Sequence, residues 1–94
     1  MKRYTANQLY DDINDLNIWL ESSGCTIRLV AGGRNNYSAV DEYSVDDDGQ
    51  RIGSGVNRNV MCGTPRECLQ ESKQHASYAI IKRLKTQQER QARQ

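Results

Sequence analysis

The stretch GTPRECLQ at residues 63–70 constrains the fold more than any other part of the chain. Thr64 has the side chain of a helix N-cap, and Pro65 suits the first helical position, where its missing N–H would have no intrahelical partner. Glu67 stands three residues after Thr64 and completes a capping box. The apolar residues that follow recur at helical spacing: Leu69, Ala76, Ile80 and Leu84. The sequence therefore predicts a long helix with a buried stripe that ends at Leu84.

A second capping box near the start of the chain predicts another helix. Thr5 and Gln8 are spaced to bond each other's backbone amides, so this helix should begin at Ala6. Gly24 supplies the left-handed turn that ends it. Four apolar residues fall on one narrow stripe of its surface: Leu9, Ile13, Leu16 and Leu20.

The segment between the two helices has the pattern of three strands. Residues 25–33 alternate their side chains between two faces, and residues 37–45 form a second candidate strand. Asp48 and Gly49 suit a tight hairpin turn, after which a third strand is expected over residues 50–56. We therefore predict an α+β fold (αβββα): a helix, a three-stranded antiparallel meander and a long C-terminal helix, with both helices on one sheet face.

Two parts of this segment depart from a regular strand. Asp41 shares a face of the second strand with four other side chains: Tyr37, Ala39, Tyr43 and Val45. A carboxylate in that position predicts a bulge, an edge or a charged partner. The glycine-rich stretch GSGVNRN at residues 53–59 is predicted to be an irregular edge or a loop that adapts to a partner surface.

The length of 94 residues fits one domain with a small core. We assign residues 1–84 to a compact α+β domain and residues 85–94 to a basic, polar extension, either helical or frayed, since no apolar stripe continues past Leu84. No apolar run is long enough for a signal peptide or a membrane span. Three cysteines are an odd number for a disulfide framework and suit a reducing cytoplasm.

The net charge of +1 conceals an uneven distribution of charge along the chain. Residues 1–48 hold four basic and nine acidic residues, a net charge of −5. Residues 49–94 hold nine basic and three acidic residues, a net charge of +6. Such asymmetry indicates an acidic partner for one half of the chain, or head-to-tail contact between copies, before it indicates any chemistry.

The sequence predicts no catalytic, metal or cofactor site. SVDDDGQRIGSG resembles a calcium loop, but Gly55 stands where the bidentate glutamate belongs. Cys68 and His75 are seven residues apart on one predicted helix, about 10.5 Å along its axis, which is too far for a dyad or for joint ligation of a metal. With one histidine and no nucleophile–base pair, the chain is not predicted to be an enzyme.

Exposed apolar side chains and an acidic hairpin indicate contact with another protein. On the first helix, Ile18 points away from the buried stripe and Trp19 flanks it, so at least one large apolar group should be exposed. A small core is often completed by a bound target or a second copy, so a homodimer is also considered. The predicted partner-binding residues are Tyr10, Ile18, Trp19, Asp46, Asp47, Asp48, Arg51 and Arg58.

The alternative is a nucleic-acid-binding protein that uses its last helix. Five basic residues fall within or beside an arc of about 140° on that helix, opposite Leu84. They are Lys82, Arg83, Lys85, Arg90 and Arg93. Favourable placement of cations near a helix C-terminus explains the same residues without any ligand.

The region in which YSVDDDGQRIGSG leads into CGTPREC resembles the small accessory proteins encoded by bacterial viruses and prophages. The resemblance covers roughly residues 37–80. Members of that group commonly bind a host protein and block or redirect it, and they include inhibitors of CRISPR and restriction systems. The resemblance implies a non-enzymatic protein that binds a host protein or complex in the cytoplasm of the host cell. The group has no common active site, so no functional residue carries over.

Overall fold

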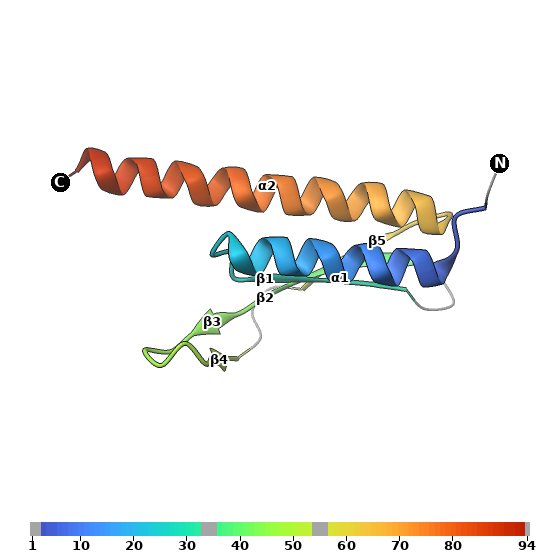
Figure 1. Ribbon diagram of the computed structural model, residues 1–94, viewed down its shortest axis with the longest axis horizontal. Coiled ribbons are helices and arrows are strands. Elements are labelled where there is room, and N and C mark those ends of the chain that lie inside the picture. Colours follow the sequence, from blue (N-terminus) through green and yellow to red (C-terminus); the bar gives the residue numbers. More distant parts are fainter. Residues whose placement is uncertain (1–2, 33–35, 54–56, 94) are drawn as a thin grey trace.

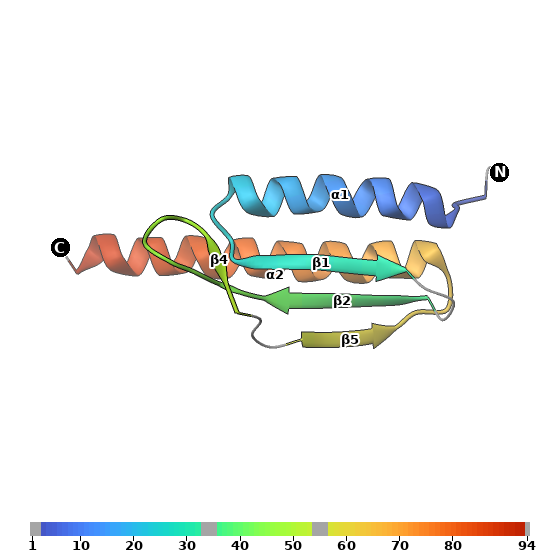
Figure 2. The same cartoon turned by 90° about the horizontal axis from the view of Figure 1, so that it is seen from below.

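The computed structural model describes residues 3–32, 36–53 and 57–93, without the side chains of Asn57 and Arg58. The elements in chain order are α1 (Ala6–Ser22), β1 (Ile27–Gly32), β2 (Tyr37–Glu42), β3 (Ser44–Val45), β4 (Arg51–Ile52), β5 (Asn57–Met61) and α2 (Pro65–Ala92) (Figure 1). The predicted α+β architecture is confirmed: a helix, three antiparallel strands that form one sheet, and a long C-terminal helix, with both helices packed on the same sheet face. The two helices run in the same direction, side by side (Figures 1 and 2).

Both helices begin where the capping residues predict. The Thr5 hydroxyl accepts from the Gln8 N–H, and the Gln8 side chain accepts from the Thr5 N–H, which closes the first capping box. The Thr64 hydroxyl accepts from the Glu67 N–H at 3.2 Å. The Glu67 carboxylate reaches back one residue further than the box predicts, to the Gly63 N–H. Both helix starts therefore follow from local sequence.

The main sheet has the order β1-β2-β5, and its register decides which side chains meet the helices. Leu29 of β1 lies opposite Val40 of β2, and Ala31 lies opposite Ser38. These four side chains are buried beneath the helices, where the Ser38 hydroxyl is 2.7 Å from the Ser72 hydroxyl of α2. Because side chains alternate along a strand, the residues between them point to the opposite face.

The core lies between this sheet face and the two helices. Helix α1 contributes the predicted leucine and isoleucine side chains, whereas α2 contributes small residues that allow close approach to the sheet. The buried apolar cluster consists of Leu9, Ile13, Leu20, Cys25, Leu29, Ala31, Val40, Cys68 and Ala76. The prediction that Leu84 is buried is wrong, since 54% of it is exposed. Figure 1 shows the C-terminal part of α2 projecting past the end of α1.

The predicted position of the third strand is also wrong. Residues 51–52 pair with residues 44–45 in a separate two-stranded hairpin, and the third strand of the main sheet is β5. The turn itself is as predicted: Gly49 has φ +81°, and the Asp46 carboxylate accepts from two backbone amides of the turn. The hairpin closes outside the main sheet because β2 ends at Glu42, before β3 begins. Residues 54–56 lie outside the described part of the chain.

The faces of the second strand differ from a simple apolar-inside pattern. Ser38 and Val40 point to the helices, so Tyr37, Ala39 and Asp41 lie on the helix-free face. The register places Asp41 opposite Arg28 of β1 on that face. The regular strand then ends at Glu42, and Val45 belongs to the hairpin instead. The unusual position of Asp41 therefore reflects a face that no helix covers.

Candidate functional site

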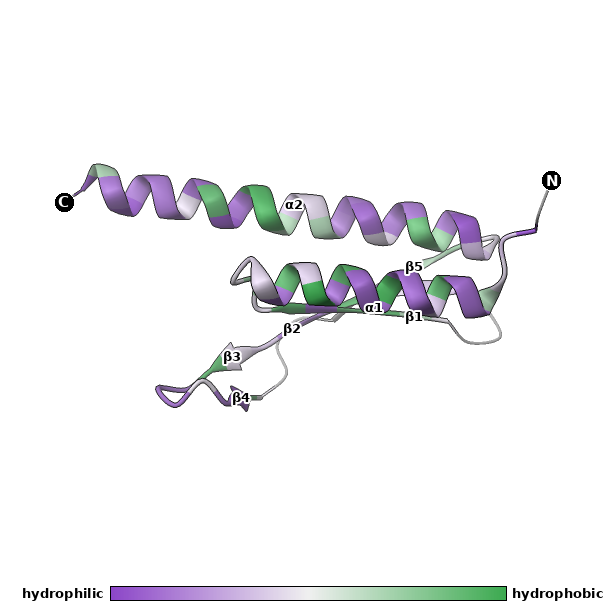
Figure 3. Ribbon diagram, in the orientation of Figure 1, coloured by the Kyte–Doolittle hydropathy of each residue, from purple (hydrophilic) through white to green (hydrophobic). Residues whose placement is uncertain are grey.

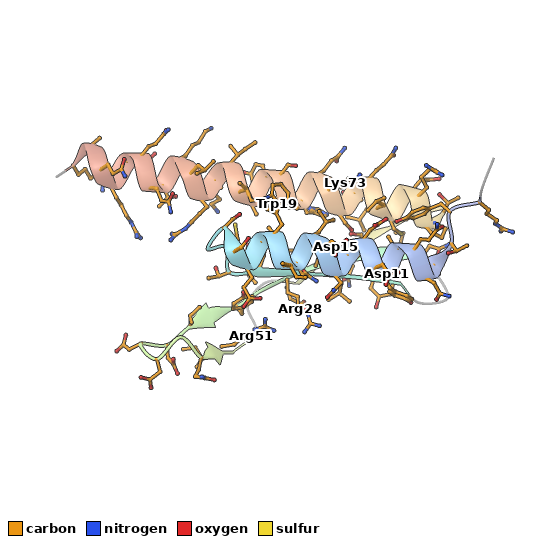
Figure 4. All side chains as sticks on the ribbon, viewed as in Figure 1. Asp11, Asp15, Trp19, Arg28, Arg51 and Lys73 are labelled. Carbon is orange, nitrogen blue, oxygen red and sulfur yellow. The ribbon has the colours of Figure 1, made fainter. Side chains whose placement is uncertain are left out.

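The residues predicted to bind a partner lie on separate surfaces. Ile18 and Trp19 are 58% and 44% exposed on α1, which confirms the exposure predicted for this pair, and Tyr10 is 47% exposed. Figure 4 shows Trp19 extending from α1 toward α2, whereas Arg51 lies on the distant hairpin. The Tyr10 ring lies against Gly32 at the end of β1, so closely that a Cβ on Gly32 would collide with it. Part of the Tyr10 side chain therefore packs within the protein, against β1.

The acidic hairpin is held by its own contacts. The Asp46 carboxylate accepts from the N–H groups of Asp48 and Gln50 at 3.0 and 2.8 Å, so it organises the turn. The Arg51 guanidinium lies 4.1 Å from the centre of the Tyr43 ring, a cation–π contact. Asp47 and Asp48 are exposed at the tip. The side chain of Arg58, another predicted contact, lies outside the described part of the chain.

The most informative geometry lies at the two edges of the main sheet. At the β1 edge, the side chain of Asn17 on α1 bonds the backbone of Leu29 in both directions. Its Nδ2 donates to the Leu29 carbonyl at 2.9 Å, and its Oδ1 accepts from the Leu29 N–H at 2.7 Å. These groups point away from β2, so the asparagine takes the place of a neighbouring strand. The β1 edge is closed to further pairing at its centre.

The β5 edge has no such cover in the described part of the chain. The Cys62 N–H donates to the Asn36 carbonyl at 2.7 Å, which fixes the alternation of backbone bonds along the β2–β5 ladder. The N–H and C=O groups of Val60 accordingly face β2, whereas those of Asn59 and Met61 point outward. No described residue hydrogen-bonds these outward groups. An unpaired row of this kind is ready to pair with another strand.

The helix-free face of the sheet adjoins this open edge. Among the side chains that the structure describes, the register places seven on it: Arg28, Val30, Tyr37, Ala39, Asp41, Asn59 and Met61. Met61 is 69% exposed beside the edge. Figure 4 shows Arg28 pointing away from the helices, in agreement with the register. If a strand were added to β5, every second side chain of that strand would therefore lie over the helix-free face.

Sequence reasoning missed both decisive features of the edges. The glycines before β5 favoured an irregular loop, although Asn59-Val60-Met61 alternates as a strand does. Asn17 was not identified as a site residue because it lies beside the apolar stripe, where a polar side chain is normally solvated. An asparagine at the margin of a buried helix face is the signal that could have indicated edge capping.

The basic residues of α2 divide into two groups. The helix continues as far as Ala92, so the predicted extension is helical in the structure. Lys82, Lys85, Arg90 and Arg93 are exposed on a largely hydrophilic surface (Figure 3). Arg83 is half-buried and packs toward Gly24, where a built Cβ would lie 3.5 Å from its Nε. It therefore does not belong to the exposed basic surface.

Cys68 is a fully buried thiol. All three cysteines are free, and burial raises the pKa of the Cys68 thiol to about 12, with a further contribution from a hydrogen bond with Cys62. Cys68 therefore stays protonated at neutral pH and is a poor nucleophile. His75 lies 3.5 Å from Glu71 on the same helix. Within residues 3–32, 36–53 and 57–93, no group of three or more potential ligands could hold a metal ion.

Because the pKa of Cys68 is raised in the folded protein, we expect the protein to lose stability at alkaline pH. The unfolded thiol ionises near pH 9.0, whereas the folded one stays neutral, so the free energy of unfolding should fall as pH rises from 9 to 12. The loss attributable to this thiol is at most about 1.4 kcal/mol per pH unit. Urea denaturation of the reduced protein at pH 8 and pH 10.5 measures it, with Cys68→Ala as the reference. An equal loss of stability in both proteins would show that Cys68 is not responsible.

Comparison with protein-family models, with curated proteins and with solved structures finds no match for this chain. No helix in the described ranges combines the length and the hydropathy that crossing a lipid bilayer requires.

Proposed function

We propose that the protein is a non-enzymatic binding module that pairs β5 with an extended segment of a partner protein. The observation that carries the proposal is the difference between the two sheet edges. Asn17 occupies the central hydrogen-bonding groups of the β1 edge, while the outward groups of β5 meet no described residue. A fold that closes one edge with a dedicated side chain and leaves the other open is arranged for strand addition.

The edge also indicates the chemistry of the partner segment. Outward backbone groups two residues apart, at Asn59 and Met61, match the spacing of an antiparallel ladder. Main-chain bonds supply affinity in this mode, and alternate side chains supply specificity. One set of partner side chains would lie over the helix-free face next to Met61, so we expect an apolar residue there. The other set would lie beside Val60, which is half-buried.

The biological setting we propose follows from the resemblance to viral accessory proteins. Such a module would act in the cytoplasm of the host cell, where free cysteines are stable. Its partner would be a host protein or complex, which it blocks or redirects by occupying one of its extended segments. Trp19 and Ile18 offer a separate apolar surface for additional contact.

Replacing Asn59 with proline tests the edge directly. Proline lacks the outward N–H but is tolerated on an edge strand, so Asn59→Pro should fold while its partner binds roughly 10- to 100-fold more weakly. Asn59→Ala keeps the N–H and should bind within about twofold of the wild type. The measurement is capture from nuclease-treated bacterial lysate, identification by mass spectrometry, and titration with the purified captured protein. Binding of the captured protein should also protect the backbone amides of Asn59 and Met61 from hydrogen exchange.

Three outcomes would contradict the proposal. Unchanged binding by Asn59→Pro would place the interface elsewhere on the protein. Capture that disappears with nuclease treatment would favour nucleic-acid binding through the exposed basic residues of α2. A dimer in light scattering that Asn59→Pro abolishes would mean that β5 pairs with a second copy instead of a partner.

A further inference from the structure

A groove of about 480 Å³ lies between the second half of α2 and the start of β1, apart from the β5 edge. Its volume falls within the range of about 300–1,000 Å³ that is typical of small-molecule sites. Ile27, Val40 and Ala79 give it an apolar wall, and three charged side chains line it: Glu42, Lys82 and Arg83. It therefore combines an apolar surface with convergent polar groups.

Arg83 is the unusual member of this groove. It follows Ala76 and Ala79 on the inward side of α2 and is half-buried. Its Nε is buried and has no hydrogen-bond partner among the described residues. The C-terminal end of α1 near Gly24 favours a positive charge there but supplies no acceptor for this N–H. A buried donor on a cation without an acceptor is costly, and an anion bound against the same guanidinium would offset part of that cost.

A second observation points to the same place. The only other buried side-chain polar atom that lacks a partner in the described part of the chain is His75 Nε2, and His75 also lines the groove. This nitrogen lies 3.5 Å from Glu71 Oε1 but makes no hydrogen bond. Both unpartnered atoms therefore belong to one groove, where two permanent cations outnumber the single carboxylate of Glu42.

We propose that this groove binds a small organic anion, in which a carboxylate or phosphate group is joined to an apolar body. The anionic group pairs with the Arg83 guanidinium, and the Lys82 ammonium adds a second positive charge. The apolar body lies against Ile27, Val40 and Ala79. A hydroxyl or amine on the ligand would donate to Glu42, the one acidic side chain of the groove.

The test follows the Arg83 Nε–Hε signal by ¹H–¹⁵N NMR while the full chain is titrated with benzoate, phenyl phosphate or benzyl alcohol. Benzoate and phenyl phosphate should each shift it saturably at millimolar concentration or below, and the stronger of the two identifies the preferred anion. Benzyl alcohol has the ring without the charge and should bind at least about tenfold more weakly. The His75 ring signals should shift along with that of Arg83.

Two variants give the proposal a matched comparison. Arg83→Gln should weaken anion binding at least about tenfold, whereas Arg90→Gln, an equal loss of charge at an exposed position of the same helix, should leave it within about twofold. Asn59→Pro should bind the anion as the wild type does, so this result is independent of the β5 proposal. Equal binding of benzyl alcohol, equal binding by Arg83→Gln, or no saturable shift in the wild type would overturn the inference.

Discussion

Replacing Leu20 with alanine should lower the free energy of unfolding by about 3 to 5 kcal/mol. Leu20 is fully buried in a core whose fully buried α2 side chains are all small: Cys68, Ser72 and Ala76. A domain of this size has a total stability of roughly 5 to 14 kcal/mol, so the loss removes a large part of it. Urea denaturation followed by circular dichroism measures the change.

Leu84→Ala is the matched control for this substitution. The same atoms are removed at a position that is 54% exposed, so we expect a cost below about 1 kcal/mol. A cost at Leu84 as large as that at Leu20 would mean that the projecting turn of α2 is covered by another part of the assembly. A small cost at Leu20 would mean that the core lies elsewhere.

Asn17→Ala should lower the free energy of unfolding by about 2 to 4 kcal/mol. It leaves both the N–H and the carbonyl of Leu29 without a partner, and an unsatisfied buried group costs about 1 to 3 kcal/mol. It also opens the second edge of the sheet, so self-association should increase with protein concentration. Denaturation and light scattering measure the two effects.

Asn14→Ala provides the reference for Asn17→Ala. Asn14 has the same side chain on the same helix but is exposed, and its side chain hydrogen-bonds no described residue. We expect a change within about 0.5 kcal/mol and no added association. If both variants behave alike, the bonds between Asn17 and Leu29 do not hold the edge.

The helices were predictable because their signals are local. Each capping residue acts within three positions of the helix start, so Thr5 and Thr64 are informative without any knowledge of the rest of the fold. The strands were less predictable, since a strand is defined by its partner. Residues 51–52 and β5 have similar composition, but only β5 lies opposite the residues of β2 that remain available for pairing.

The apolar periodicity predicted which face of each helix is buried. It did not predict how far along the helix that face stays covered by other elements. Leu84 continues the apolar stripe of α2, yet 54% of it is exposed. Arg83 was placed at the rim of a basic arc, whereas the structure turns it inward after Ala76 and Ala79. Exposure at these two positions depends on element lengths, which local spacing does not contain.

The shape of the molecule has a consequence for its motion in solution. It measures 52 × 27 × 19 Å, and α2 lies along the longest axis (Figure 1). The N–H bonds of an α-helix are nearly parallel to its axis, so spinning about the long axis does not reorient those of α2. Only the slower end-over-end rotation does. Strand N–H bonds lie across the strand direction and reorient with the faster spin as well. Amide ¹⁵N relaxation should therefore report a longer apparent correlation time for the helices than for the sheet, as though the helices belonged to a larger molecule.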